Sequence, residues 1–115
     1  MFLQKWYGKN YNLDNYVSLE DSAAIGWLES DNESVRLIGS DSLTRARAEW
    51  ALPQLIQMLD DGHMMNRQFT QIGLEAMRDV ELRTFGYRHY MTEPERQAPL
   101  NKMRKAWLPM KDAEK

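Results

Sequence analysis

An internal repeat limits the folds open to this chain more than any other feature. Shifting the sequence by 31 residues places IGWLESDNESVRLIGSDSLTRA (25–46) on IQMLDDGHMMNRQFTQIGLEAM (56–77). The shift aligns Ile25 with Ile56, Leu28 with Leu59, Arg36 with Arg67 and Leu43 with Leu74. A weaker copy, EPERQAPLNKMRKAW, follows 29 residues later and places Arg96 under Arg67. A fixed period of this length is typical of stacked supersecondary units, so the sequence predicts a repeat architecture.

Apolar residues recur at intervals of three and four, which indicates that the units are helical. Helices are expected over residues 19–29, 33–46, 50–60, 64–82 and 93–107. Ser18 and Ser30 are each followed three residues later by an acidic residue, the pattern of a capping box at a helix start. Thr92 begins a similar signal. Pro99 interrupts the last range, so this helix either kinks there or begins near Ala98.

The apolar positions predict which face of each helix is buried. In the 50–60 helix, Pro53 fits the first turn and Gly62 is expected to close the helix in a left-handed conformation. The apolar face of this helix is formed by Leu52, Leu55, Ile56 and Leu59. The strongest stripe belongs to the 64–82 helix and contains Met65, Phe69, Ile72, Ala76 and Val80. The weaker stripe of the 33–46 helix contains Val35, Ile38, either Ser42 or Leu43, and Ala46. These stripes are expected to face the core.

The segment WALPQLIQMLDDGHMMNRQFTQIGLEAM (50–77) resembles a HEAT-like repeat, most similar to the short bacterial form of phycobilisome-lyase-type HEAT proteins. The resemblance rests on the pattern A-L-P-x-L-I-x-x-L-D-D before the corner and an arginine after it. The tail FGYRHYMTEPERQAPLNKMRKAW is also similar to the ending of some bacterial HEAT-like domains. Asn66, Thr70 and Gln71 depart from the family pattern, which expects a valine and small residues there.

This resemblance covers residues 19–108 and implies an all-α fold, a short right-handed α-solenoid of two to three HEAT-like helical hairpins. Because a helical pair cannot cover its own apolar face, the ends of such a stack need capping segments. The expected single domain, 1–115, comprises an N-terminal capping segment 1–17, repeat 1 at 18–47, repeat 2 at 48–83, a degenerate repeat or C-terminal cap at 87–108 and a flexible tail at 109–115. The aromatic residues expected to cover the ends are Phe2, Trp6, Tyr7, Tyr11, Tyr16 and Trp107.

The tetrapeptide Asp60-Asp61-Gly62-His63 lies at the break between two apolar runs, where it could be a site for chemistry or a corner between helices. A zinc site would need at least three protein ligands, and a calcium loop would need a D-x-D-x-D-G pattern. Neither pattern is present around His63. The sequence therefore predicts a corner, with no metal and no cofactor.

Arginine recurs in register after each corner, as Arg36, Arg67 and Arg96. These residues could form a row of phosphate-binding side chains, or a row of structural side chains that hold the helix corners together. The HEAT-like resemblance implies the structural role, in which each arginine bonds to acidic residues at neighbouring corners. Asp60 and Asp61 are then expected to accept hydrogen bonds from amides of the next helix or to pair with Arg67.

Composition excludes several classes of function. The chain has 115 residues, a net charge of −2 and no cysteine, so thiol chemistry and a whole-chain attraction to nucleic acid are both excluded. The N-terminus lacks the apolar stretch of a signal peptide, and no run reaches the roughly 20 apolar residues that span a bilayer. A cytoplasmic protein without a membrane partner is the default expectation. Because no serine, histidine and carboxylate form a recognised triad, no catalytic residue is assigned.

The expected function is binding of another protein through the second helix of each pair. With the apolar stripe of the 64–82 helix inward, the outward residues and their equivalents 31 residues earlier are Gln71, Glu75, Arg78, Ser40, Thr44 and Arg47. These are the predicted contacts. An alternative is nucleic-acid binding, through the basic and aromatic N-terminus or through Lys102, Arg104 and Lys105. Homo-oligomeric packing is a third possibility.

Overall fold

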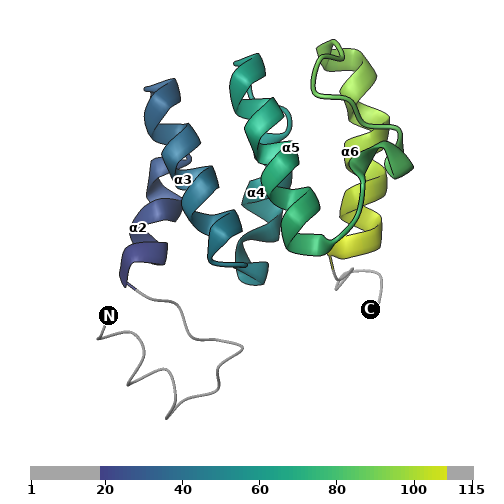
Figure 1. Cartoon of the computed structure of the whole chain (residues 1–115). Coiled ribbons are helices and arrows are strands. Elements are labelled where there is room, and N and C mark those ends of the chain that lie inside the picture. The colour runs from purple at the N-terminus through teal and green to yellow at the C-terminus, as the bar shows by residue number, and fades with distance from the viewer. Residues whose placement is uncertain (1–18, 109–115) are drawn as a thin grey trace, which may run out of the picture.

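The structure is a computed structural model that describes residues 19–108 (Figure 1). Its elements are α2 (Leu19–Trp27), α3 (Glu33–Arg45), the 3-10 helix η2 (Glu49–Ala51), α4 (Leu52–Met58), α5 (Met64–Arg78), the 3-10 helix η3 (Leu82–Phe85) and α6 (Glu93–Trp107). Every regular element between residues 19 and 108 is helical, which confirms the all-α class. None of these helices combines the length and the apolar character that crossing a membrane requires.

The helices form two pairs and a final single helix. Helix α2 packs against α3, α4 packs against α5, and α3 lies beside α5. Figure 1 shows α3, α5 and α6 standing in a row, with α4 behind them. Helix α6 contacts both α4 and η3. The second helices of the two pairs, α3 and α5, therefore form one face of the molecule.

Helix α3 starts where predicted, but a different residue caps it. Helix α3 begins at Glu33, but its N-cap is Asn32, whose side chain accepts hydrogen bonds from the amides of Ser34 and Val35 at 2.8 and 3.2 Å. Ser30, the predicted cap, instead accepts a hydrogen bond from the Asn32 amide. Ser18 lies outside the described residues.

Helix α6 carries the predicted capping box, in which the Thr92 side chain accepts from the Glu95 amide and the Glu95 carboxylate accepts from the Thr92 amide at 2.8 Å. These hydrogen bonds lower the pKa of Glu95. The helix is continuous from Glu93 to Trp107 with the buried Pro99 inside it. A start near Ala98 is therefore wrong.

Two helix ends differ from the predictions, α5 because a residue other than glycine adopts the left-handed conformation and α4 because no residue at its corner does. Helix α5 ends at Arg78, four residues earlier than predicted, since Asp79 takes a φ of 58° there. Gly62 does not have a positive φ; among the glycines in the described part of the chain, Gly86 does, with a φ of 91° after η3. The corner after α4 is instead closed by Asp61, whose carboxylate accepts a hydrogen bond from the His63 amide at 3.0 Å.

The predicted face of α4 forms the centre of the core. Leu52, Leu55, Ile56 and Leu59 are all buried, as predicted. Tyr87, between η3 and α6, is also fully buried, and its hydroxyl donates to the Leu59 carbonyl at 2.7 Å. At the C-terminal end of the described chain, Trp107 packs edge-on against Phe85 with ring centroids 5.4 Å apart. The N-terminal aromatic residues lie outside the described residues.

The predicted orientation of α5 is wrong. Its apolar stripe faces outward: Phe69 is 47% exposed and Ile72 is 53% exposed, and Met65, Ala76 and Val80 are exposed with them. The buried residues of α5 are Asn66, Arg67, Thr70, Leu74 and Met77. Helix α3 departs in part: Ile38 is 53% exposed, whereas Leu43 is buried as predicted, together with the unpredicted Gly39, Ser40 and Thr44.

Hydrogen bonds across the α3–α5 contact account for this orientation. Asn66 donates to the Glu33 carbonyl at 3.0 Å, and the hydroxyls of Ser40 and Thr70 are 2.7 Å apart. These polar groups satisfy one another inside the contact, where an unpaired group would cost about 1–3 kcal/mol. The helices therefore meet through paired polar side chains and leave the apolar stripe outside.

Glycines allow the helices of this face to approach closely. A Cβ added at Gly73 would lie 2.5 Å from Oγ1 of Thr44, and one at Gly39 would lie 2.9 Å from the carbonyl oxygen of Ala24. Both distances are shorter than van der Waals contact. The α2–α3 and α3–α5 contacts therefore each depend on the absence of a side chain.

Candidate interaction surface

The recurring arginines join the helix corners. Arg36 bonds the Asp61 carboxylate through Nε at 2.8 Å and through a terminal nitrogen at 3.2 Å, and it also donates to the Ser30 carbonyl at 2.9 Å. The hydrogen bond to Asp61 raises the pKa of Arg36. This bidentate pair connects the first helical pair to the corner of the second.

Arg67 connects its own corner to the chain that precedes α6. It donates to the carbonyls of Asp61 at 2.6 Å and His89 at 2.8 Å, and it is buried. The predicted bond between Arg67 and an aspartate side chain is therefore replaced by bonds to main-chain oxygens. The Asp61 carboxylate instead pairs with Arg36 and accepts from Asn66.

Arg96 repeats the arrangement in α6. It donates to the Met91 carbonyl at 2.6 Å and bonds the Asp60 carboxylate at 2.8 Å. In α3, α5 and α6 the arginine is the fourth residue of the helix, and in each case it takes a main-chain carbonyl five or six residues earlier. All three guanidinium groups thus have bonds within the chain.

The predicted contact residues of α3 lie against α5. Ser40 and Thr44 are buried, Ser40 bonding Thr70 and Thr44 packing on Gly73. Arg47 donates to the Met77 carbonyl at 3.2 Å. The prediction that Ser40 and Thr44 face a partner is therefore wrong, because the polar contact between α3 and α5 covers them.

The equivalent residues of α5 contact the chain that follows this helix and, at Arg78, also η2, which precedes it. Gln71 bonds Glu75 at 3.1 Å and the His89 ring at 3.2 Å, and Glu75 accepts from the Leu82 amide at 2.9 Å. Arg78 pairs with Glu49 and lies 4.9 Å from the centre of the Trp107 ring. The six residues chosen from the 31-residue offset therefore occupy equivalent places, but these places join successive parts of the fold.

An apolar surface remains on the outer side of the two second helices. We call it the α3–α5 apolar face and define it by Ile38, Met65, Phe69, Ile72 and Ala76, all exposed. A hollow of about 270 Å³ between the helices is lined by Leu37, Ile38, Asp41 and Phe69. The one carboxylate at this hollow, Asp41, is paired with Arg45 at 2.9 Å. Periodicity had found these apolar residues but had assigned them to the core.

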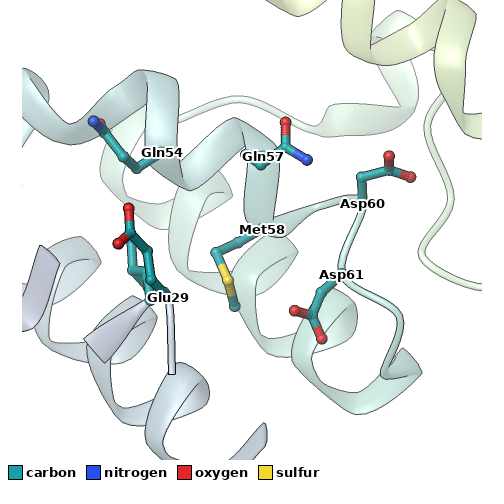
Figure 2. A pocket seen from close by; sticks show the side chains of 7 residues that line it. Glu29, Gln54, Gln57, Met58, Asp60 and Asp61 are labelled. Carbon is teal, nitrogen blue, oxygen red and sulfur yellow. The ribbon is translucent and has the colours of Figure 1, made fainter. Parts of the chain in front are cut away.

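A second hollow, of about 350 Å³, lies at the corners of the two helical pairs (Figure 2). It is lined by Leu28, Glu29, Gln54, Gln57, Met58, Asp60 and Asp61. Both aspartates already bond arginines. In the described part of the chain, no three histidine, cysteine or acidic side chains come together in a way that could hold a metal ion. The acidic residues of this hollow therefore hold the helix corners together, and we do not take the hollow as the candidate site.

One of the three basic residues proposed for nucleic-acid binding in α6 is hydrogen-bonded within the chain. Arg104 donates to Asn101 at 3.1 Å and to Gln57 at 3.2 Å, whereas Lys102 and Lys105 are exposed. The same helix begins with Glu93 and Glu95, so it carries both signs of charge. The basic N-terminal residues lie outside the described residues.

The fold and this surface can be compared with known proteins. No protein-family model, curated protein or solved structure matches the chain. The HEAT-like resemblance thus remains a prediction.

Proposed function

We propose that this chain is a non-catalytic protein-interaction module, a scaffold or adaptor built as a short HEAT-like α-solenoid, which binds a partner through its second helices. The observation that carries the proposal is the α3–α5 apolar face. Two of its members, Phe69 and Ile72, are about half exposed although they belong to the most regular apolar stripe of the sequence. A monomeric protein gains nothing from this arrangement, because apolar area left in water contributes no burial energy.

The size of the face supports a protein partner. A large apolar side chain has ~200 Å² of surface, so the half-exposed members of the face and the adjacent Met64 together present roughly 500 Å². Contiguous apolar patches of this size are at the upper end for monomers and are often functional. A standard interface covers about 800 Å² of each partner, of which somewhat more than half is apolar. The face is therefore large enough for the apolar part of such an interface.

The arginine contacts support the solenoid part of the proposal. Arg36, Arg67 and Arg96 occupy the same helix position and each bonds a main-chain oxygen of the preceding corner. Residues related by the 31-residue offset, such as Arg47 and Arg78, lie at equivalent junctions. Repeated contacts at repeated positions are the physical basis of a stacked architecture.

The test is affinity capture from the native cell with three tagged chains. The wild type is compared with a Phe69→Gln, Ile72→Gln double variant and with a Tyr90→Gln control. Tyr90 is 64% exposed, more than Phe69 or Ile72, but lies outside the α3–α5 apolar face, so the control removes an accessible aromatic ring elsewhere. We expect the double variant to lose a protein that the wild type and the control both retain. Equal capture by all three chains would refute the proposal.

A further inference from the structure

We infer that the partner on the α3–α5 apolar face is a second copy of this chain, which packs its own α5 antiparallel against the first across a two-fold axis. This inference rests on the proposed function and names the occupant of the same surface. It follows from the spacing of the exposed residues on α5, from the sizes of their side chains and from the charge of the surface.

The exposed residues of α5 have the spacing of a coiled-coil seam. Met65, Phe69, Ile72 and Ala76 follow one another in steps of four, three and four residues. This is the a/d spacing that keeps one side of a helix against another helix. The surface therefore fits a helix better than an extended strand, whose side chains repeat every two residues.

The seam is complementary to itself only when the two helices run in opposite directions. The steps four, three, four read the same from either end, so an antiparallel copy places Met65 against Ala76 and Phe69 against Ile72 of the other chain. Each contact then joins a larger side chain to a smaller one, the condition for close packing. In a parallel pair, Phe69 would meet Phe69 and Ala76 would meet Ala76, crowding one level and leaving a gap at another.

The charges around the seam permit this contact. No member of the seam is ionisable, and the Glu75 carboxylate is turned to the opposite side, where it accepts from the Leu82 amide and Gln71. Asp41, at the hollow beside Phe69, is paired with Arg45. Two identical surfaces can therefore meet without placing like charges together, which a contact between equal patches requires.

The apolar area that two copies would bury is also sufficient for a stable dimer interface. The face and the adjacent Met64 present roughly 500 Å² of apolar surface, so two copies would bury on the order of 1,000 Å² of it. A standard interface of about 1,600 Å² has this apolar content when the polar residues at its rim, such as Gln68 and Ser34, are included.

The first experiment measures the mass of the purified full chain by sedimentation over a wide range of concentrations. The wild type is expected to change from 13.6 kDa to twice this mass as its concentration rises. Ile72→Glu should weaken dimerisation on the order of a hundredfold, because it places a carboxylate in the apolar seam of both copies. Tyr90→Gln should dimerise as the wild type does. Circular dichroism of each variant shows that its helices are intact.

The second experiment tests the direction of the helices by disulfide trapping. The chain has no cysteine, so introduced thiols react only with each other. Met65→Cys chains mixed with Ala76→Cys chains should form a mixed disulfide on mild oxidation. Met65→Cys alone should not, since the two residues 65 of an antiparallel pair lie ~16 Å apart along the helices. Efficient trapping by Met65→Cys alone would indicate a parallel pair and would overturn the arrangement.

The outcomes separate this inference from the proposed function. A wild type that stays at 13.6 kDa at every concentration overturns the inference, and the proposed function still stands if Phe69→Gln, Ile72→Gln abolishes capture of a different protein. A wild type that dimerises and loses dimerisation on Ile72→Glu supports both. A monomeric wild type whose protein capture does not depend on the face overturns both.

Discussion

At the scale of single residues, Tyr87 ties the irregular chain before α6 to the core. Its fully buried hydroxyl donates to the carbonyl of Leu59, the C-cap residue of α4. Carbonyls at a helix C-terminus have no partner within the helix, so this bond satisfies one of them. The tyrosine thereby closes α4 and fixes the connection that follows η3.

Tyr87→Phe should lower the free energy of unfolding by about 1–3 kcal/mol, because the Leu59 carbonyl would stay buried without a donor. Urea denaturation followed by circular dichroism measures this change. Tyr90→Phe is the matched control, and since Tyr90 is 64% exposed its effect should stay within about 0.5 kcal/mol. Equal effects of the two substitutions would show that the buried bond adds no stability.

Burial should also make stability depend on alkaline pH. Desolvation raises the pKa of Tyr87 in the folded state, although Arg67 and Arg96 nearby act to lower it. The unfolded chain therefore releases this proton first, near the ordinary pKa of 10.0. The contribution of Tyr87 is complete below that pH and decreases as the pH rises above it. In urea denaturation at a series of pH values, the stability difference between wild type and Tyr87→Phe should shrink above pH 10.0; parallel curves would contradict this.

Ion pairs of this protein should differ in value according to their burial. The Arg96 and Asp60 side chains are 6% and 17% exposed, whereas those of Arg45 and Asp41 are 79% and 55% exposed. Asp60→Ala leaves a buried guanidinium without its carboxylate and should cost about 3 kcal/mol. Asp41→Ala should change the unfolding free energy by less than about 1 kcal/mol. Chemical denaturation of both variants makes the comparison, and similar costs would mean that the Arg96 pair is not shielded from water.

At the scale of the elements, α5 is turned with its polar side inward. Its buried residues Asn66, Arg67 and Thr70 are bonded to groups of α3, of the Asp61 corner and of the chain before α6. Each of these bonds crosses between segments, so the orientation of α5 depends on several neighbours together. The apolar stripe of α5 is exposed as a result.

The close approach of α2 and α3 depends on Gly39. Alanine normally stabilises a helix relative to glycine by about 0.5–1 kcal/mol, but at Gly39 the added Cβ would lie 2.9 Å from the Ala24 carbonyl oxygen. A backbone atom cannot move aside alone, so Gly39→Ala should destabilise the protein by about 1–3 kcal/mol. Gly26→Ala is the matched control, since Gly26 lies in α2 with no atom within 4 Å of its added Cβ, and it should be stabilising. Thermal unfolding distinguishes the two, and a stabilising Gly39→Ala would show that α2 and α3 separate easily.

At the scale of the whole molecule, the sequence predicted the helices and their corners but not which sides meet. Composition and spacing were enough for the all-α class, the face of α4, the Thr92 capping box and the corner at residues 60–63. The rotation of α5 could not be predicted, because periodicity shows that a helix has an apolar side without showing what covers it. The inward side is set by pairs such as Ser40 with Thr70, which are 30 residues apart in the sequence.

The inferred dimer gives a prediction for the whole molecule. If the α3–α5 apolar face is covered by a second copy in the folded state alone, folding and association are linked. The midpoint of thermal unfolding should then rise with protein concentration for the wild type and for Tyr90→Gln. It should be independent of concentration for Ile72→Glu. Differential scanning calorimetry provides this measurement, and a concentration-independent wild type would contradict the linkage.

The bonds of Arg67 affect how the sequence can vary. Because its guanidinium is held by the main-chain oxygens of Asp61 and His89, any residue at position 89 offers the same acceptor. Arg36 and Arg96 each bond one main-chain oxygen and, in addition, the carboxylate of Asp61 or Asp60. Substitutions at position 89 can therefore leave the hydrogen bonds of Arg67 intact. Substitution of Asp61 or Asp60 removes the ion pair with Arg36 or Arg96 unless the arginine is replaced as well.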